Sequence, residues 1–279
     1  MPEVRRCAVR VAQRVERRDV VLHLQRAAEA GRDDFDGGAV SRRGVGGTDV
    51  GPIVSMYRPE LAADCAKYAN ATDVAMRLLY DIERPRSKVM ARGLDAEPRL
   101  RRAYLDAYGG TFAAHPEPWI VRHPTLPWAS CSPDDVLAPL PSSALLSLPT
   151  LVEYKSTSIF ARHKYGDAES DEVPPLYGLQ VQWSMEILDL PLAHVFVGFG
   201  RDYEENGEHK FLYEETRRFL VPRDREIAAM CIDYCSQYHA EFIEGRKLPP
   251  LAPVNNKRAY SQLLKGSHPC QQQTEAHSP

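Results

Sequence analysis

An aspartate, a glutamate and a lysine follow one another in this 279-residue chain in an order that suits metal chemistry. Asp134 follows a Ser-Pro pair, and Glu153 and Lys155 lie in the segment LVEYK, separated by one residue. Two carboxylates that are brought close together repel each other unless a cation neutralises them. Mg²⁺ suits such a pair, because it binds one or two carboxylates and keeps waters and phosphate oxygens as further ligands. The set therefore predicts metal-assisted hydrolysis, and the alternative is an exposed salt-bridged pair on a solvated strand.

The neighbouring residues predict the elements that must position this set. The segment LVEYK is typical of a half-buried strand, on which Glu153 and Lys155 point to one face and Tyr154 points to the other. Asp134 follows a turn and precedes an apolar Val-Leu pair, which favours a neighbouring strand. In this arrangement Lys155 would orient or deprotonate the attacking water, or hold the scissile phosphate.

The sequence around these residues resembles the PD-(D/E)XK nucleases, and in particular the branch that holds bacteriophage lambda exonuclease and the YqaJ-type viral recombinases. The resemblance rests on the segments SCSPDDVL, LVEYKS and YGLQVQWSM, in this order. It implies a restriction-endonuclease-like α/β (α+β) core, with a central mixed β-sheet flanked by helices. The family's usual Gly after the catalytic Asp is Asp135 here, so either acid could bind the metal, and position in the turn favours Asp134.

The resemblance also implies a set of metal ligands. Asp134 and Glu153 would bind Mg²⁺, or Mn²⁺, together with the backbone carbonyl of Tyr154. Glu97 stands in a segment similar to the family's G-x-x-x-E helix and would face the metal directly or through water. The alternative for Glu97 is an ordinary surface pair with Arg101, four residues further along a helix.

Two glutamines complete the implied site. Gln180 or Gln182 would support the substrate or Lys155. Because residues two apart diverge by roughly 200° around a helix, the two glutamines cannot share one face. We expect one of them to face the active site and the other to face the core edge or the DNA.

A glycine-rich motif opens the part of the chain that we expect to fold. The segment GVGGTDV resembles the family's opening Gly-Gly-Ser-Asp motif, with Thr48 in the place of the Ser. Thr48 or Asp49 would cap a helix that starts at Val50, and helix N-termini bind phosphate readily. The resemblance implies that Arg42, Arg43 and Thr48 contact the 5′-terminal phosphate of DNA. A plain N-cap preceded by a basic surface pair is the alternative.

The remaining pattern predicts a mixed succession of helices and strands. We expect helices over residues 59–79, 85–110 and 224–245, and a β-hairpin from strands at 193–200 and 210–220. Arg99, Arg101 and Arg102 are candidates for contacts with DNA phosphates, although a solvated helix face is the default for such a run.

The domain organisation follows from composition. Residues 1–43 are predicted to form a loosely ordered, charge-rich arm, residues 44–254 the nuclease domain, and residues 255–279 a disordered tail. The six cysteines fit no zinc pattern. Cys231 and Cys235 stand one turn apart on a predicted helix, which favours core cysteines, so we expect no iron–sulfur cluster.

Bulk charge and hydropathy limit the partners. The formal net charge is −3, so binding of double-stranded DNA would need a local basic groove. No apolar run is long enough to span a membrane, and the Arg-rich beginning lacks the apolar region of a secretory signal. We therefore expect a cytoplasmic protein of a bacterial host or of a phage in an infected cell.

Together these observations predict a metal-dependent deoxyribonuclease. The resemblance favours a 5′-to-3′ exonuclease of phage-type recombination, which leaves single-stranded tails for an annealing protein and forms a homo-trimer around DNA. One alternative is an endonuclease of the repair or restriction type with the same fold. Another is a non-catalytic DNA-binding module, against which the complete Asp/Glu/Lys set argues.

Overall fold

A four-stranded mixed sheet forms the centre of the protein in the computed structural model, which describes residues 44–82, 87–110, 120–138, 148–206 and 208–250. Its strands run in the order β3 (Asp135–Leu137), β4 (Thr150–Ser158), β5 (Leu192–Glu205) and β6 (Glu208–Pro222). β4 is antiparallel to β3 and parallel to β5, and β5 is antiparallel to β6. The predicted central mixed sheet is confirmed.

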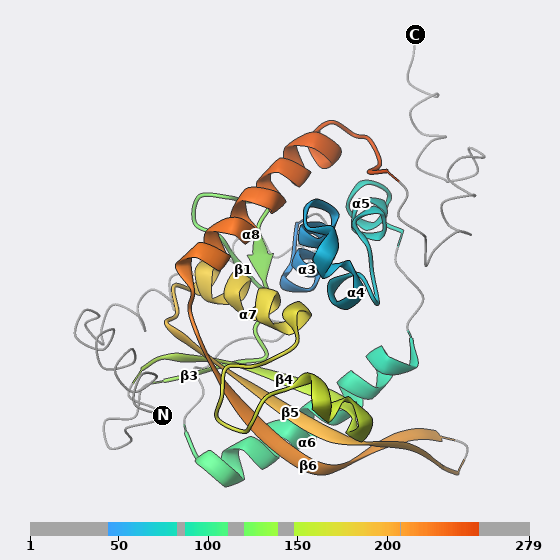
Figure 1. The fold of residues 1–279 in the computed structure, drawn as a ribbon, viewed down its shortest axis with the longest axis vertical. Helices are drawn as coiled ribbons and strands as arrows, with labels where there is room; N and C mark the ends of the chain where they lie inside the picture. Colours follow the sequence, from blue (N-terminus) through green and yellow to red (C-terminus); the bar gives the residue numbers. More distant parts are fainter. Residues whose placement is uncertain (1–43, 83–86, 111–119, 139–147, 207, 251–279) are drawn as a thin grey trace.

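Helices cover both faces of this sheet (Figure 1). One face carries the long helix α6 (Lys88–Tyr108), and the other carries α7 (Pro175–Leu188), with α3 (Gly47–Tyr57) and α8 (Arg225–Tyr238) packed on α7. Buried side chains form two separate clusters: a large one around Trp183 on the α7 face and a small one around Tyr104 and Phe196 on the α6 face. The two faces of β4 therefore belong to different environments.

Shorter elements complete the described part of the chain. They are η2 (Pro59–Leu61), α4 (Ala62–Cys65), α5 (Ala71–Tyr80), β1 (Val121–Arg122), β2 (Ser130–Cys131), η3 (Ile159–Lys164) and the π-helical turn η4 (His239–Glu244). β1 and β2 pair with each other in a small antiparallel sheet. None of the helices within the described ranges has the length and apolar character that a membrane crossing needs.

Two helix predictions were wrong in their bounds. The helix expected over 59–79 is broken, because the Asn70 side chain accepts a hydrogen bond from the Asp73 amide at 3.0 Å and starts a new helix there. The opening helix begins at Gly47 rather than Val50. Gly46 is its N-cap, and the Asp49 carboxylate accepts from the Gly46 amide at 2.7 Å.

The cysteines in the described part of the chain lie in the core. Cys65, Cys131, Cys231 and Cys235 are buried and free. The last two face the core from α8, as the sequence predicted. The predicted arm, residues 1–43, and the predicted tail, residues 255–279, lie outside the described residues together with Cys7 and Cys270, so these domain bounds stay predictions.

Candidate active site

β4 presents an acid and a base on the face that α7 covers. Glu153 is 2% exposed, and its Oε1 accepts a hydrogen bond from Lys155 Nζ at 2.5 Å. Tyr154, between them, points to the opposite face and packs with Tyr104 and Phe196. The predicted alternation of β4 is confirmed, and it places Glu153 and Lys155 side by side.

α7 supplies a second donor to the same glutamate. Gln180 Nε2 donates to Glu153 Oε1 at 2.6 Å, so this oxygen receives two hydrogen bonds. The other oxygen, Glu153 Oε2, is buried without a hydrogen-bond partner. Burial of a carboxylate oxygen without a hydrogen-bond donor costs free energy, and a bound cation would offset this cost.

Asp134 lies beside this glutamate at the start of the edge strand. Its Oδ2 accepts from the Tyr154 amide at 2.7 Å, and the register of β3 and β4 sets Asp135 opposite Val152. Burial raises the pKa of Asp134 well above its usual value, and the Glu153 carboxylate raises it further. The Lys155 ammonium group lowers this pKa, and Glu97 raises it by a smaller amount. The arrangement holds more negative charge than one lysine compensates.

The donor set fits a hard divalent cation. Asp134 and Glu153 contribute carboxylate oxygens, which are the ligands that Mg²⁺ and Mn²⁺ prefer, and Mg²⁺ needs only one or two of them because waters fill its other positions. Within the described ranges, no three His, Cys, Asp or Glu side chains are gathered to hold a metal together. Glu97 is near enough to Asp134 to raise the pKa of its carboxyl group.

Lys155 keeps its proton in this environment. Burial alone would lower the pKa of its ammonium group, but the Glu153 and Asp134 carboxylates outweigh burial and raise the pKa above the usual value. The Nζ atom also lies over the Tyr177 ring, 5.2 Å from its centroid. Of the roles predicted for Lys155, orientation of a water or phosphate therefore suits this geometry better than removal of a proton.

The two adjacent aspartates, Asp134 and Asp135, point to opposite faces of the sheet. Asp135 is fully buried on the α6 face, where Arg101 donates to both of its oxygens at 2.8 and 3.0 Å and the Tyr154 hydroxyl donates at 3.0 Å. Only Asp134 points toward Glu153. Arg101 therefore forms an ion pair with Asp135 of β3, which is not the contact with DNA phosphates that the sequence suggested.

The other arginines of the α6 run also meet carboxylates. Arg99 pairs with Asp95 at 2.5 Å, and Arg102 pairs with Asp106 at 3.1 Å, each four residues away on the same helix. These ion pairs within one helix agree with the solvated helix face that the sequence analysis gave as the default for these arginines.

Gln182 is not brought to the site. Its Nε2 donates to the Pro222 carbonyl at 2.8 Å, and its Oε1 accepts from the Asp224 amide at 2.8 Å. Gln182 therefore ties α7 to the connection between β6 and α8. The predicted divergence of the two glutamines is confirmed, with Gln180 as the one that faces the acidic residues.

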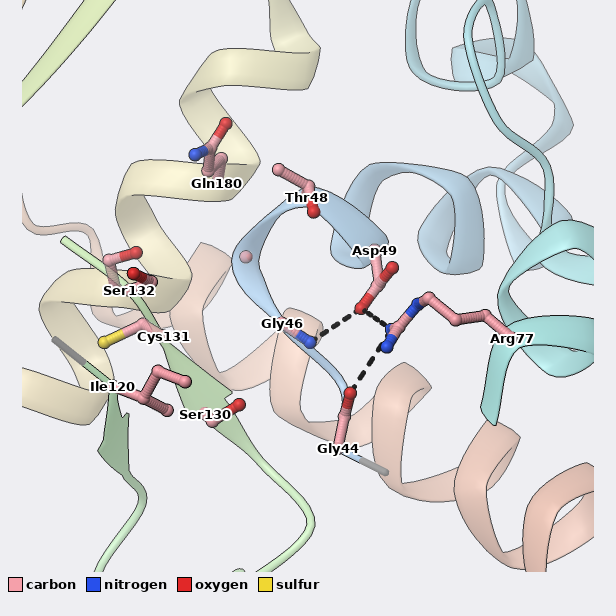
Figure 2. A pocket seen from close by; sticks show the side chains of 12 residues that line it. Gly44, Gly46, Thr48, Asp49, Arg77, Ile120, Ser130, Cys131, Ser132 and Gln180 are labelled. Atoms are coloured by element: carbon pink, nitrogen blue, oxygen red, sulfur yellow. Dashed lines mark hydrogen bonds and ion pairs between the residues drawn. The ribbon is translucent and has the colours of Figure 1, made fainter. Parts of the chain in front are cut away.

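A cavity of about 360 Å³ opens at the N-terminus of α3, next to these residues. Figure 2 shows it between the start of α3, β2 and α7, with Thr48, Gln180 and Ser132 on its wall. Arg77 reaches in from α5 and bonds to Asp49 Oδ2 at 2.6 Å and to the Gly44 carbonyl at 3.3 Å. The helix N-terminus, the hydroxyl groups and the guanidinium favour an anion, whereas the Asp49 carboxylate, which also lines the cavity and pairs with Arg77, opposes one.

The cavity and the acidic residues share a wall. Gln180 lines the cavity and also bonds to Glu153, and Ser132 precedes Asp134 by two residues. The start of α3 lies so close to α7 that a Cβ on Gly47 would come within 3.2 Å of Gln180 Cγ, which accounts for the glycine there. Of the predicted phosphate ligands, Thr48 lines the cavity, and Arg42 and Arg43 lie outside the described residues.

Sequence reasoning missed Arg77. It lies 28 residues after Asp49 in a helix without a family motif, and only tertiary packing brings the two residues together. A buried acid in the first turn of α3 was the one available signal, because such an acid needs a cationic partner.

A mixed sheet between helical layers, with an Asp directly before an edge strand and a Glu and a Lys on the next strand, is typical of the PD-(D/E)XK-like class of folds. The chain belongs to the YqaJ-like viral recombinase domain family, whose family model matches residues 39–190. This confirms the resemblance seen in the sequence.

Several solved structures are similar to this chain. LHK-Exo, an alkaline exonuclease from Laribacter hongkongensis, is 19% identical, with 74% of this chain and 91% of that chain covered and a TM-score of 0.50. Its complex with dAMP gives 18%, the same coverage and a TM-score of 0.51. A phage-related exonuclease from Haemophilus somnus 129PT is 15% identical, with 73% and 96% covered and a TM-score of 0.47. No curated protein sequence matches the chain significantly.

Family membership supports a nuclease of the lambda exonuclease type, and the solved structures support the fold alone.

Proposed function

We propose that the protein is a metal-dependent deoxyribonuclease that degrades one strand of double-stranded DNA from its 5′ end. One observation carries the proposal: Glu153 is held by Lys155 and Gln180, keeps one oxygen without a donor, and faces Asp134. This combination suits cleavage of a phosphodiester, because cations and donors converge where negative charge accumulates.

The side chains have separate roles in this proposal. Asp134, Glu153 and the Tyr154 carbonyl would hold Mg²⁺ or Mn²⁺, with Glu97 contacting it through water. When bound, the metal would stabilise the charge that develops on the phosphate oxygens and lower the pKa of a bound water. Lys155, protonated between the two carboxylates, would orient the water or the scissile phosphate. Gln180 would hold the Glu153 carboxylate in place.

The cavity at the start of α3 is the basis for the choice of a 5′ end. A terminal phosphate carries more charge than an internal one and needs an enclosed anion site, which the α3 amides, Thr48 and Arg77 would provide. Arg42 and Arg43 would add to it. Because Gln180 belongs to the cavity and to the acidic site, a phosphate bound there would set the scissile bond beside Glu153.

The test uses three DNA substrates: a 5′-phosphorylated linear duplex, the same duplex with 5′-hydroxyl ends, and a covalently closed circle. We expect loss of the 5′ strand of the first in the presence of Mg²⁺ or Mn²⁺, slower loss of the second, and an intact circle. A chelator and the Lys155→Ala variant should each abolish the reaction. Cleavage of the circle would replace the exonuclease by an endonuclease. An intact linear duplex with both metals would favour the binding module.

Arg77 gives a sharper test of end recognition. Arg77→Gln should reduce the preference for 5′-phosphate over 5′-hydroxyl ends by tenfold or more, because a charge-assisted pair with phosphate contributes about 1.5–3 kcal/mol. Arg58→Gln, which removes an exposed ion pair with Glu60, is the matched control. If Arg77→Gln keeps the wild-type preference for 5′-phosphate ends, the cavity does not bind the terminal phosphate.

The resemblance to lambda exonuclease also supports a homo-trimer, a single-strand annealing partner and action in the cytoplasm of a bacterial or phage-infected cell. Light scattering of the purified protein would test the first, since a trimer has three times the 31.4 kDa mass of one chain. Co-purification with the annealing protein from the same genome would test the second. A monomer with full activity would contradict the trimer.

A further inference from the structure

An ion pair between buried Asp135 and Arg101, whose side chain is 43% exposed, lies directly behind the candidate metal site, on the α6 face of the sheet. Asp135 is fully buried, and Arg101 Nε and Nη2 donate to its two oxygens at 2.8 and 3.0 Å. This two-pronged contact fixes the orientation of both groups, because the planar guanidinium matches the carboxylate in one geometry only. The Tyr154 hydroxyl adds a third hydrogen bond at 3.0 Å.

Tyr154 connects this ion pair to the acidic site. Its amide donates to Asp134 and its hydroxyl donates to Asp135, so one residue of β4 holds two successive carboxylates that point to opposite faces. A movement of Asp135 would therefore be transmitted to Asp134 through a single peptide unit of β3.

The strand that follows Asp134 is short, and the buried side chains of Val136 and Leu137 pack it into the core. β3 is an edge strand of three residues, and it contacts β4 through three residue pairs. A ladder this short fixes the strand weakly, because local stability follows the number of buried contacts and hydrogen bonds. The side-chain bonds of Asp135 therefore add to the core packing of Val136 and Leu137 in holding Asp134 in position.

Arg101 extends the connection to α6. Glu97 lies four residues earlier on this helix, one turn away. The bond from Arg101 to Asp135 therefore joins the helix that carries Glu97 to the strand that begins directly after Asp134. Two of the proposed metal contacts come from elements that this one ion pair ties together.

We propose that the Arg101–Asp135 pair is a positioning brace that fixes α6 against β3, so that Asp134 and Glu97 meet the metal held by Glu153. In this proposal neither member of the brace binds the metal, and each acts through the residues it holds. The inference rests on the proposed function only for the presence of that metal.

Direct titration with Mn²⁺, by calorimetry or electron paramagnetic resonance, tests the brace without DNA. Arg101→Leu should weaken Mn²⁺ binding by about tenfold to a hundredfold, as the loss of groups that orient metal ligands does elsewhere. Simple electrostatics predicts the opposite sign, because removal of a positive charge favours a cation. Arg102→Leu, the same change at the neighbouring exposed ion pair with Asp106, should bind within twofold of the wild type.

The double variant Arg101→Leu/Asp135→Asn separates positioning from folding. It removes both charges, so its local net charge equals that of the wild type and no unpaired buried acid remains. We expect its melting temperature to return toward the wild-type value while Mn²⁺ binding stays at least tenfold weaker. The Asn keeps an acceptor for the Tyr154 hydroxyl.

Three outcomes would overturn the inference. Mn²⁺ binding by Arg101→Leu that is as tight as in the wild type would show that the pair does not position the ligands. Recovery of Mn²⁺ affinity together with thermal stability in the double variant would show that the pair serves the fold alone. If the wild-type protein binds no Mn²⁺, the proposed metal site itself is wrong. This result is obtained before any variant is made, so it is distinguished from a failure of the brace alone.

Discussion

Replacement of Asp134 by Asn should stabilise the metal-free protein. The pKa of Asp134 is raised by burial and by the Glu153 carboxylate, so the folded state holds the acid proton more tightly than the unfolded chain does. Such a group contributes stability below its unfolded pKa, near 4, and this contribution is lost as the pH rises through the folded value. At neutral pH the ionised Asp134 therefore costs free energy, and Asn removes the charge while it keeps an acceptor for the Tyr154 amide.

The size of the effect follows from the pKa. Each unit by which the folded pKa exceeds the unfolded one corresponds to about 1.4 kcal/mol at a pH above both values. For a domain of this size, 1 kcal/mol shifts the melting temperature by about 2–4 °C. We therefore expect Asp134→Asn to melt several degrees higher than the wild type at pH 7.5 in a chelator, in thermal unfolding followed by circular dichroism.

Asp135→Asn is the matched control, because it makes the same chemical change at the next residue. Asp135 is fully buried and paired with Arg101, so its neutralisation should lower the melting temperature instead. Addition of Mg²⁺ should raise the melting temperature of the wild type but not of Asp134→Asn. The reasoning is refuted if Asp134→Asn melts below the wild type at pH 7.5, or if its advantage persists undiminished at pH 3.

Three further predictions concern neighbouring residues. Lys155→Met leaves the buried Glu153 without its cation and should lower the free energy of unfolding by about 3–5 kcal/mol in urea titrations. Addition of Glu153→Gln should restore this stability, and a loss below about 1 kcal/mol would contradict the buried pair. Gln182→Leu should cost about 1–3 kcal/mol of stability and spare DNA cleavage, whereas Gln180→Leu should spare stability and impair cleavage; the reverse pattern would exchange their roles. Burial, aided by Arg218, lowers the pKa of His194 to about 3. The free energy of unfolding should therefore fall as the pH drops below about 6.5, by up to about 1.4 kcal/mol per pH unit. His194→Gln should reduce this pH dependence, and an equal pH dependence in the variant would show that another group titrates.

The parts of the site that the sequence could predict are those set by local periodicity. The two-residue repeat of a strand puts Glu153 and Lys155 on one face, and the helical repeat separates Gln180 from Gln182. Both follow from backbone geometry alone. The order of the motifs along the chain was sufficient for the family and for the mixed sheet.

The parts that it could not predict depend on contacts between distant elements. Arg101 was a candidate for DNA contacts because its partner, Asp135, lies 34 residues away and only the packing of α6 on the sheet brings them together. Arg77 met Asp49 in the same way. The break before α5 was local, and Asn70 followed by Asp73 was a readable capping signal that the apolar pattern around it obscured.

The short edge strand also has a consequence for how the site is lost and regained in solution. Glu153, Lys155 and Gln180 all lie within the continuous unit of β4, α7 and β5, whereas Asp134 depends on the three-residue strand β3. Local opening of β3 would dismantle the pair of carboxylates while the core stays folded. Amide hydrogens of the β3–β4 ladder should therefore exchange with deuterium by such an opening, and bound Mn²⁺ should slow their exchange far more than that of the β5–β6 ladder.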